Sequence, residues 1–186
     1  LRENSDNDDH IIKSDSTFTL SNCSFSVFAK YKGNDRNIKL SLGTGKYASF
    51  NLKDGYVFDV QTLTIAKIEK YSNGWYRCSI TGNISASKLN IILLNNVNEV
   101  YQGDGTSGIY IYGAQLEEGS YPTSYIPTNG SAVTRQADTA NGAGNSEVFN
   151  DSEGVLFADM SFLENNTSAY NRLSLSDGSS HNRILI

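Results

Sequence analysis

The 186-residue sequence has few of the residues that build metal centres, disulfide frameworks or membrane spans. It contains two cysteines, two histidines, two prolines, one methionine and one tryptophan. Its longest apolar run, Ile91–Leu94, is far shorter than the ~18 residues that a membrane helix needs. Nothing at the N-terminus resembles a signal peptide, although the chain starts at Leu1 and its natural start is expected to lie upstream. We therefore expect no membrane insertion.

Catalytic signatures are also missing. His10 and His181 lie far apart in the sequence, and no Cys-x-x-Cys, His-x-x-x-His or Gly-x-Ser-x-Gly pattern occurs. Adjacent acids such as Glu117 and Glu118 alternate across a strand end and are expected to point apart. The sequence predicts no catalytic residues, no cofactor and no enzyme activity within this chain.

The charge balance argues against nucleic acid as a partner. The chain has 20 acidic and 15 basic residues, which gives a net charge of -5, and its lysines and arginines form no cluster. A protein that binds a phosphate backbone needs a concentrated basic surface. We expect no nucleic-acid binding.

Two segments look superficially like ion or phosphate loops. The oxygen-bearing side chains of Asn4–His10 alternate as in calcium loops, but the glycine and glutamate of an EF-hand are absent. A solvated acidic loop is the expectation there, with a looser calcium site as the alternative. Gly103–Gly108 has the glycine density of a phosphate loop, but neither a lysine nor a helix follows. It is predicted to be a turn, and no metal ligand is assigned.

Cys23 and Cys78 could form one disulfide. However, Cys78 alternates with Tyr76 and Ile80 on a face that should be buried, and buried cysteine is common without a disulfide. Free thiols, and assembly in the cytoplasm, are the expectation.

What the sequence has in abundance is 16 glycines, 11 tyrosines and 8 phenylalanines, together with many serines, threonines and asparagines. This composition is typical of β-sandwiches rich in turns. No segment keeps a helical apolar period for long enough to form a helix. About eight strands, separated by turns of glycine, asparagine and aspartate, favour a jelly-roll or a related two-sheet sandwich. They are predicted at 23–31, 36–43, 47–52, 56–60, 66–71, 75–81, 88–94 and 108–116, and a short strand signal occurs at His10–Lys13.

Alternation predicts which faces are buried. In the segment 36–43, Ile38 and Leu40 should point inward while Lys39 and Ser41 point to solvent, as in a half-solvated strand. In the segment 108–116, apolar and aromatic residues occupy both faces, with Ile109, Ile111 and Gly113 on one and Tyr110, Tyr112 and Ala114 on the other, so both faces are expected to be covered.

The chain leaves this last strand through both of its prolines. Pro122 and Pro127 lack an N–H and bias the residues before them toward extended conformations. Tyr121, Tyr125 and Ile126 can still pack. We therefore predict an extended strap over Ser120–Thr128, lying on the domain that it completes.

The domain organisation expected is a first domain over 1–128, a linker over 129–146, and a second β-sandwich that begins at 147. The linker range is rich in glycine, alanine, serine, threonine and asparagine, which cannot bury a core. Strand signals return at "GVLFADMSFL" (154–163) and in the hairpin-like "NRLSLSDGSSHNRILI" (171–186). About 40 residues are too few for an independent domain, so the second sandwich is expected to be truncated or completed by another chain.

Two stretches resemble a known family. "NGWYRCSIT" (73–81) and "YQGDGTSGIYIYGAQLEEGSYPTSYIPTNGSAVTRQAD" (101–138), with "SVFAK" (26–30), closely resemble a module repeated in bacteriophage tail and fibre proteins, which is similar to jelly-roll carbohydrate-binding modules. The resemblance covers about Thr17–Asp138. The segment after Glu153 resembles the start of a concanavalin-like or laminin-G-like lectin domain.

The resemblance implies a structural virion protein of a tail fibre, tailspike or head fibre, located in the virion and assembled in the host cytoplasm. It implies other virion proteins and host cell-surface glycan as partners, and a homo-oligomer, with a trimer by analogy. The alternative is a non-catalytic accessory module of a polysaccharide-degrading tailspike or of a secreted glycan-active enzyme.

One departure from the family concerns a structural calcium site. Where many such modules carry an acidic residue in the last strand, this chain has Gly113 and Ala114.

The expected glycan contacts are aromatic. Trp75 is predicted opposite the buried Tyr76 and Cys78 face, where it could stack on a sugar ring while Arg77 donates hydrogen bonds to hydroxyls. The alternative is that Trp75 covers the sandwich edge and Arg77 pairs locally. The remaining candidates are on the last strand and the strap: Tyr110, Tyr112, Tyr121 and Tyr125. Net negative charge and the lack of a metal cluster favour a neutral or cationic glycan.

Overall fold

A computed structural model describes residues 1–62, 64–136, 153, 157, 174–176 and 183–185. The chain divides into two compact units, Leu1–Arg135 and Gln136–Ile186, and the division lies inside the range 129–146 that the sequence assigns to a linker. The described part of the first unit contains ten strands and one 3-10 turn, and no α-helix. The strands are β1 (Asn7–Lys13), β2 (Phe18–Lys30), β3 (Arg36–Ser41), β4 (Tyr47–Asn51), β5 (Tyr56–Phe58), β6 (Ile65–Lys70), β7 (Trp75–Ser87), β8 (Asn90–Asn95), β9 (Val100–Gln102) and β10 (Tyr110–Glu118).

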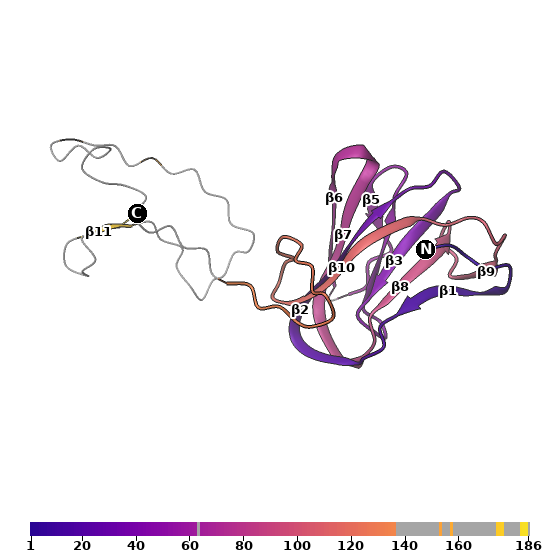
Figure 1. Cartoon of the computed structure of the whole chain (residues 1–186), viewed down its shortest axis with the longest axis horizontal. Coiled ribbons are helices and arrows are strands. Elements are labelled where there is room, and N and C mark those ends of the chain that lie inside the picture. The colour runs from indigo at the N-terminus through magenta and orange to yellow at the C-terminus, as the bar shows by residue number, and fades with distance from the viewer. Residues whose placement is uncertain (63, 137–152, 154–156, 158–173, 177–182, 186) are drawn as a thin grey trace. The chain divides into compact units, whose positions relative to one another are not determined.

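The strands form two antiparallel sheets with one apolar core between them (Figure 1). The six-stranded sheet has the order β5-β4-β3-β8-β1-β9, and the four-stranded sheet has the order β10-β2-β7-β6. Alternate residues of each sheet fill the core, including Phe25 and Val27 of β2, Ile38 of β3, and Cys78 and Ile80 of β7. The all-β, jelly-roll-like sandwich predicted from the sequence is confirmed.

Strand β3 differs from its prediction on the outer face. Ile38 and Leu40 point into the core as expected, but Lys39 and Ser41 are also buried, at 5% and 6% exposed. Lys39 lies over the ring of Tyr47 and forms ion pairs with neighbouring acids, so its charge is compensated away from bulk water. The prediction that this strand is half-solvated was therefore wrong. Alternation indicates that Lys39 and Ser41 lie on the outer face, but it does not tell whether water or polar side chains cover that face.

Strand β10 contains a β-bulge that the alternation rule does not anticipate. Its register with β2 shifts between Tyr112, which pairs with Phe28, and Gln115, which pairs with Ser26. Gly113 adopts φ 63°, and a side chain there would meet Phe28 and Tyr125 at 3.2 Å. The extra residue places Gln115 on the same outer face as Tyr112.

The expectation that both faces of this strand are covered was also wrong. Ile109 is buried on the inner side, whereas Tyr110 and Tyr112 are 52% and 56% exposed on the outer face of the four-stranded sheet.

The segment Ser120–Thr128, which the sequence predicts to be a strap, folds back on β10. The backbone N–H of Thr123 donates to Glu117 Oε1 at 3.0 Å, and that of Ile126 donates to Gln115 Oε1 at 2.9 Å. The bulge makes this possible, because both acceptors project from the outer face. Tyr125 packs on the sheet, while Tyr121 is 41% exposed.

Both cysteines are free and buried, as predicted. Burial raises the pKa of the Cys78 thiol and also that of Cys23, whose Sγ donates to the Gly82 carbonyl at 3.3 Å. These thiols are inert core residues.

In the second unit, β11 (Ser174–Ser176) pairs antiparallel with β12 (Arg183–Leu185), as the predicted strand, turn and strand require. The strand predicted at 154–163 and most of the predicted linker lie outside the described residues, so the second sandwich stays a prediction.

Candidate functional site

Aromatic side chains gather on the outer face of the four-stranded sheet, around Phe28. The ring of Tyr71 meets Phe28 edge-on with centroids 5.1 Å apart, and Tyr112 and Tyr125 lie 6.0 and 6.4 Å from it. Tyr125 of the strap also contacts Tyr112 at 5.1 Å. These four residues and Trp75 are called the aromatic cluster below.

Strand register explains why residues so distant in sequence meet. Phe28 of β2 pairs with Tyr112 of β10 on one side and with Arg77 of β7 on the other, so all three side chains project from the same face. Trp75 is two residues before Arg77 on that face. Tyr71 reaches it from the other side of the Ser72–Gly74 turn, where its N–H donates to the Trp75 carbonyl at 2.8 Å.

A hollow of about 210 Å³ opens within this cluster. Four aromatic side chains, Phe28, Tyr71, Trp75 and Tyr112, line it together with Ser72. Partial desolvation and the neighbouring Tyr125 raise the pKa of Tyr112 above its usual value. A shallow apolar hollow with neutral hydroxyls at its rim can take the flat face of an uncharged ring.

Arg77 lies beneath this surface. Its side chain is only 4% exposed, its guanidinium stacks on the Phe28 ring at 5.4 Å, and Nη2 donates to Ser26 Oγ at 3.0 Å. Within the described part of the chain, Nε has no partner and no carboxylate forms an ion pair with Arg77. The geometry matches the sequence-based alternative in which Arg77 pairs locally. Its role here is to support the Phe28 ring.

Of the six residues proposed from the sequence, Trp75 and Tyr112 line the hollow, Tyr125 packs against Tyr112, and Arg77 lies beneath Phe28. Tyr110 and Tyr121 are exposed but do not line the hollow. The sequence analysis missed Phe28 and Tyr71. The only available signal for Phe28 was that it faces away from the apolar side of its strand, and Tyr71 follows a strand end with no pattern to mark it.

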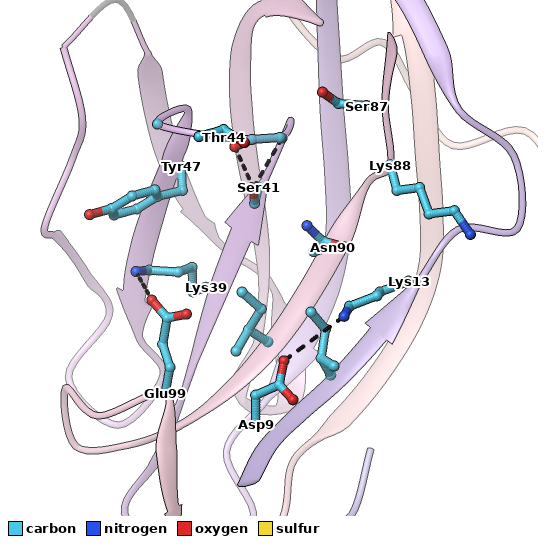
Figure 2. A pocket seen from close by; sticks show the side chains of 14 residues that line it. Asp9, Lys13, Lys39, Ser41, Thr44, Tyr47, Ser87, Lys88, Asn90 and Glu99 are labelled. Atoms are coloured by element: carbon cyan, nitrogen blue, oxygen red, sulfur yellow. Dashed lines mark hydrogen bonds and ion pairs between the residues drawn. The ribbon is translucent and has the colours of Figure 1, made fainter. Parts of the chain in front are cut away.

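A second candidate surface is a polar groove of about 430 Å³ on the outer face of the six-stranded sheet (Figure 2). It runs across β1, β8, β3 and β4, and two isoleucines, Ile11 and Ile92, form its apolar part. None of its residues was proposed from the sequence. Each looks like an ordinary strand or turn residue in its own segment, and only the pairing of the strands brings them together. The other lining residues are Asp9, Lys13, Lys39, Ser41, Gly43, Thr44, Gly45, Tyr47, Ser87, Lys88, Asn90 and Glu99.

Each side of this groove carries a lysine that is paired with an acidic side chain. On one side, Lys39 Nζ is 2.5 Å from Glu99 Oε1 and 3.5 Å from Asp59 Oδ2, and lies 3.6 Å from the centroid of the Tyr47 ring. On the other side, Lys13 is 4.0 Å from Asp9. Figure 2 shows an ion pair on each side, Lys39 with Glu99 and Lys13 with Asp9.

The remaining sequence candidates are ordinary structure. Within the described residues, no group of three or more histidine, cysteine, aspartate or glutamate side chains could hold a metal. Part of that segment is strand β1, and His10 is buried. The predicted turn at Gly103–Gly108 is organised by Asp104, which accepts from the N–H groups of Thr106 and Ser107. In the described part of the chain, no helix is long and apolar enough to cross a membrane.

Comparison with known proteins adds no family. No protein-family model matches the chain, and no curated protein matches it significantly.

Proposed function

We propose that the first unit is a non-catalytic glycan-binding module of a virion structural protein, of the tail-fibre, tailspike or head-fibre kind. The virion setting is supported by the sequence resemblance over Thr17–Asp138. The observation that carries the binding role is the hollow that Trp75 and Tyr112 line together with Phe28 and Tyr71, with Tyr125 packed against Tyr112. Trp75 and Tyr112 were both predicted as sugar contacts, and strand register places them on the same outer face although they are distant in the sequence.

The hollow suits a weakly bound, uncharged sugar. Rings of Phe28, Tyr71 and Tyr112 supply apolar faces, and tyrosine hydroxyls supply hydrogen bonds at the rim. Because the site is shallow and open, affinity is expected in the range of about 0.1 to 1 mM. Multiple copies in a fibre would then supply avidity.

A glycan array probed with the full chain tests this role. We expect binding to neutral surface glycans, and Trp75→Ala should weaken it by at least about tenfold, which corresponds to about 1.4 kcal/mol. Tyr121→Ala is the matched control, because Tyr121 is exposed on the strap and lies outside the hollow. Circular dichroism establishes that each variant is folded. A folded wild type that binds no glycan would reduce the unit to a spacer, and equal losses for the two variants would remove the hollow from the site.

The same proposal includes self-association. Strands β5, β9, β6 and β10 form the sheet edges in the described part of the chain, and unpaired edges are commonly covered in fibre assemblies. A homo-oligomer, with a trimer first by analogy, is the expected state. Mass measurement of the full chain at micromolar concentration decides it, and a monomer would contradict it.

A further inference from the structure

Strand β6 has the longest unbroken free edge in the described part of the chain. Two of the other edge strands, β5 and β9, are only three residues long. The remaining one, β10, is interrupted by the bulge at Gly113. Strand β6 extends over Ile65–Lys70 and pairs with β7 along its whole length without a register shift. A regular edge of this kind is a template for a further strand.

Only every second residue of β6 directs its backbone groups to the free edge. The Tyr71 N–H donates to the Trp75 carbonyl at 2.8 Å, and the Lys67 carbonyl accepts from the Ser79 hydroxyl at 3.4 Å. The odd-numbered residues therefore direct their N–H and C=O groups toward β7. The backbone groups of the even-numbered residues 66, 68 and 70 then face outward, and no backbone partner for them occurs among the described residues.

The side chains on the outer face of β6 are complementary to the same strand read in reverse. In chain order they are apolar, positive, negative and aromatic: Ile65, Lys67, Glu69 and Tyr71. Ile65 is 68% exposed and Tyr71 is 45% exposed, so their apolar surface is available to a partner. Lys67 and Glu69 form a solvent-exposed ion pair at 2.8 Å, which contributes little to stability by itself.

We propose that β6 pairs with β6 of a second copy of this chain, antiparallel and about a two-fold axis that passes at Ile68. Residues that face each other in an antiparallel pair both direct their backbone groups to the partner or both away from it, so even-numbered residues lie opposite even-numbered ones. With the axis at Ile68, Lys67 lies opposite Glu69 of the second copy, and Ile65 lies opposite Tyr71 of the second copy.

Charge selects this register over its neighbours. An axis at Lys67 would place that lysine opposite its own copy, and an axis at Glu69 would do the same with the glutamate. Like charges that lie directly opposite each other destabilise a strand pair, whereas opposite charges stabilise it. The register at Ile68 is the one that provides two cross-strand ion pairs and two contacts between apolar side chains.

The contact joins the four-stranded sheets of two copies into one continuous sheet of eight strands. A two-fold contact uses the same edge on both copies, so it closes with two of them. It therefore assigns a dimer, where the sequence resemblance implies a trimer. The axis is perpendicular to the sheet, so the two aromatic hollows lie on the same side of the dimer. Bivalent binding through these hollows rests on the proposed function, whereas the dimer itself does not.

Sedimentation equilibrium of the full chain, from micromolar to millimolar concentration, tests the contact. We expect a monomer–dimer equilibrium with a dissociation constant in the range of about 1 to 100 µM. Lys67→Glu should raise this constant at least about tenfold, because it places like charges opposite each other at two symmetric positions. Adding Glu69→Lys to that variant should restore the wild-type constant to within about threefold, because opposite charges face each other again.

Lys13→Glu is the matched control. Lys13 is 54% exposed and Lys67 57% exposed, each is paired with one acid, and both substitutions change the net charge equally. Because Lys13 lies on the other sheet, its substitution should leave association unchanged.

Hydrogen exchange of the backbone amides tests the register. At a concentration where the wild type is dimeric, the amides of Ala66, Ile68 and Lys70 should exchange at least about tenfold more slowly than in Lys67→Glu, because the dimer buries them in hydrogen bonds. The amides of Lys67 and Glu69 face β7 in both states and should not differ.

Three results would overturn the inference. One is a wild type that remains monomeric at millimolar concentration, and glycan binding by such a monomer would leave the binding role standing. Another is a dimer or trimer that Lys67→Glu leaves intact, which would place the interface elsewhere. The third is a double variant that is folded by circular dichroism but does not regain association.

Discussion

At the scale of single residues, Glu3 is a buried carboxylate whose oxygens are both hydrogen-bonded. It is 2% exposed and bonded at both oxygens, to Arg36 at 2.7 and 2.8 Å, to the Tyr101 hydroxyl at 2.8 Å and to the Asp104 N–H at 2.8 Å. The Arg36 hydrogen bonds, which outweigh burial, lower the pKa of Glu3 below its usual value. This residue fastens the N-terminal segment to strands β3 and β9.

The Glu3 network predicts an acid-sensitive stability. Because the folded pKa lies below the unfolded one, the ionised carboxylate contributes fully above about pH 4.5, and its contribution is lost as pH falls through the folded pKa. Glu3→Gln should cost about 3 kcal/mol at pH 7, since the buried Arg36 loses its nearer counter-charge and keeps only Asp104 at 4.0 Å. The difference from wild type should shrink toward pH 3.

Urea unfolding at several pH values measures both quantities. Glu118→Gln, which changes an exposed acid at the end of β10, serves as the control and should track the wild type. A Glu3→Gln deficit that stayed constant from pH 7 to pH 3 would mean that the carboxylate's charge is not what stabilises the network.

At the scale of elements, strand β10 and the strap act as one unit. The bulge at Gly113 turns Gln115 and Glu117 outward, and their side chains then bind the strap backbone as a neighbouring strand would. Arg135 adds a further hydrogen bond from its Nε to Thr123 Oγ1 at 2.9 Å. These hydrogen bonds clamp the strap onto β10. The position of Tyr125 in the aromatic cluster therefore depends on them.

Glu117→Ala should therefore release the strap without unfolding the sandwich. The Thr123 N–H and hydroxyl lose their acceptor, so we expect limited proteolysis within 120–128 to accelerate by about tenfold, with a loss in global stability of about 1 kcal/mol. Glu118→Ala, one residue away and exposed, is the control. Equal protease resistance in the two variants would contradict a clamp at Glu117.

At the scale of the whole molecule, the core of the described residues belongs entirely to the first unit. Every fully buried residue of that core lies between Cys23 and Ile109, and both sheets close around it. A compact unit that has its own hydrophobic core is expected to fold by itself.

A chain ending at residue 135 should therefore unfold cooperatively, with a midpoint within about 3 °C of the corresponding transition in the full chain. A chain ending at residue 118 lacks the strap and should melt earlier, because the outer face of β10 loses its cover. Differential scanning calorimetry distinguishes the three chains. A non-cooperative transition for 1–135 would show that the first unit needs the rest of the chain.

Much of this architecture was determined by the sequence alone. Alternation in 36–43, the turn residues between segments and the aromatic strand at 108–116 predicted a two-sheet sandwich, because apolar residues with a period of two can be buried only on a sheet face. Two prolines after a strand predicted an extended exit from it, because they cannot continue a ladder. Burial of Cys78 followed from the same alternation.

Tertiary structure decided the rest. Phe28 and Tyr71 became the middle of an aromatic hollow only through the register of β2 with β7 and β10, and a register is a relation between segments that no single segment encodes. Lys39 was predicted exposed because a lysine at an outward position usually meets water, but Tyr47, Asp59 and Glu99 enclose it. The bulge at Gly113 reversed the side-chain alternation beyond it. The Glu117 carboxylate therefore faces outward and accepts hydrogen bonds from the strap. The local pattern decides which faces are apolar, whereas pairing between distant strands decides which polar and aromatic side chains meet.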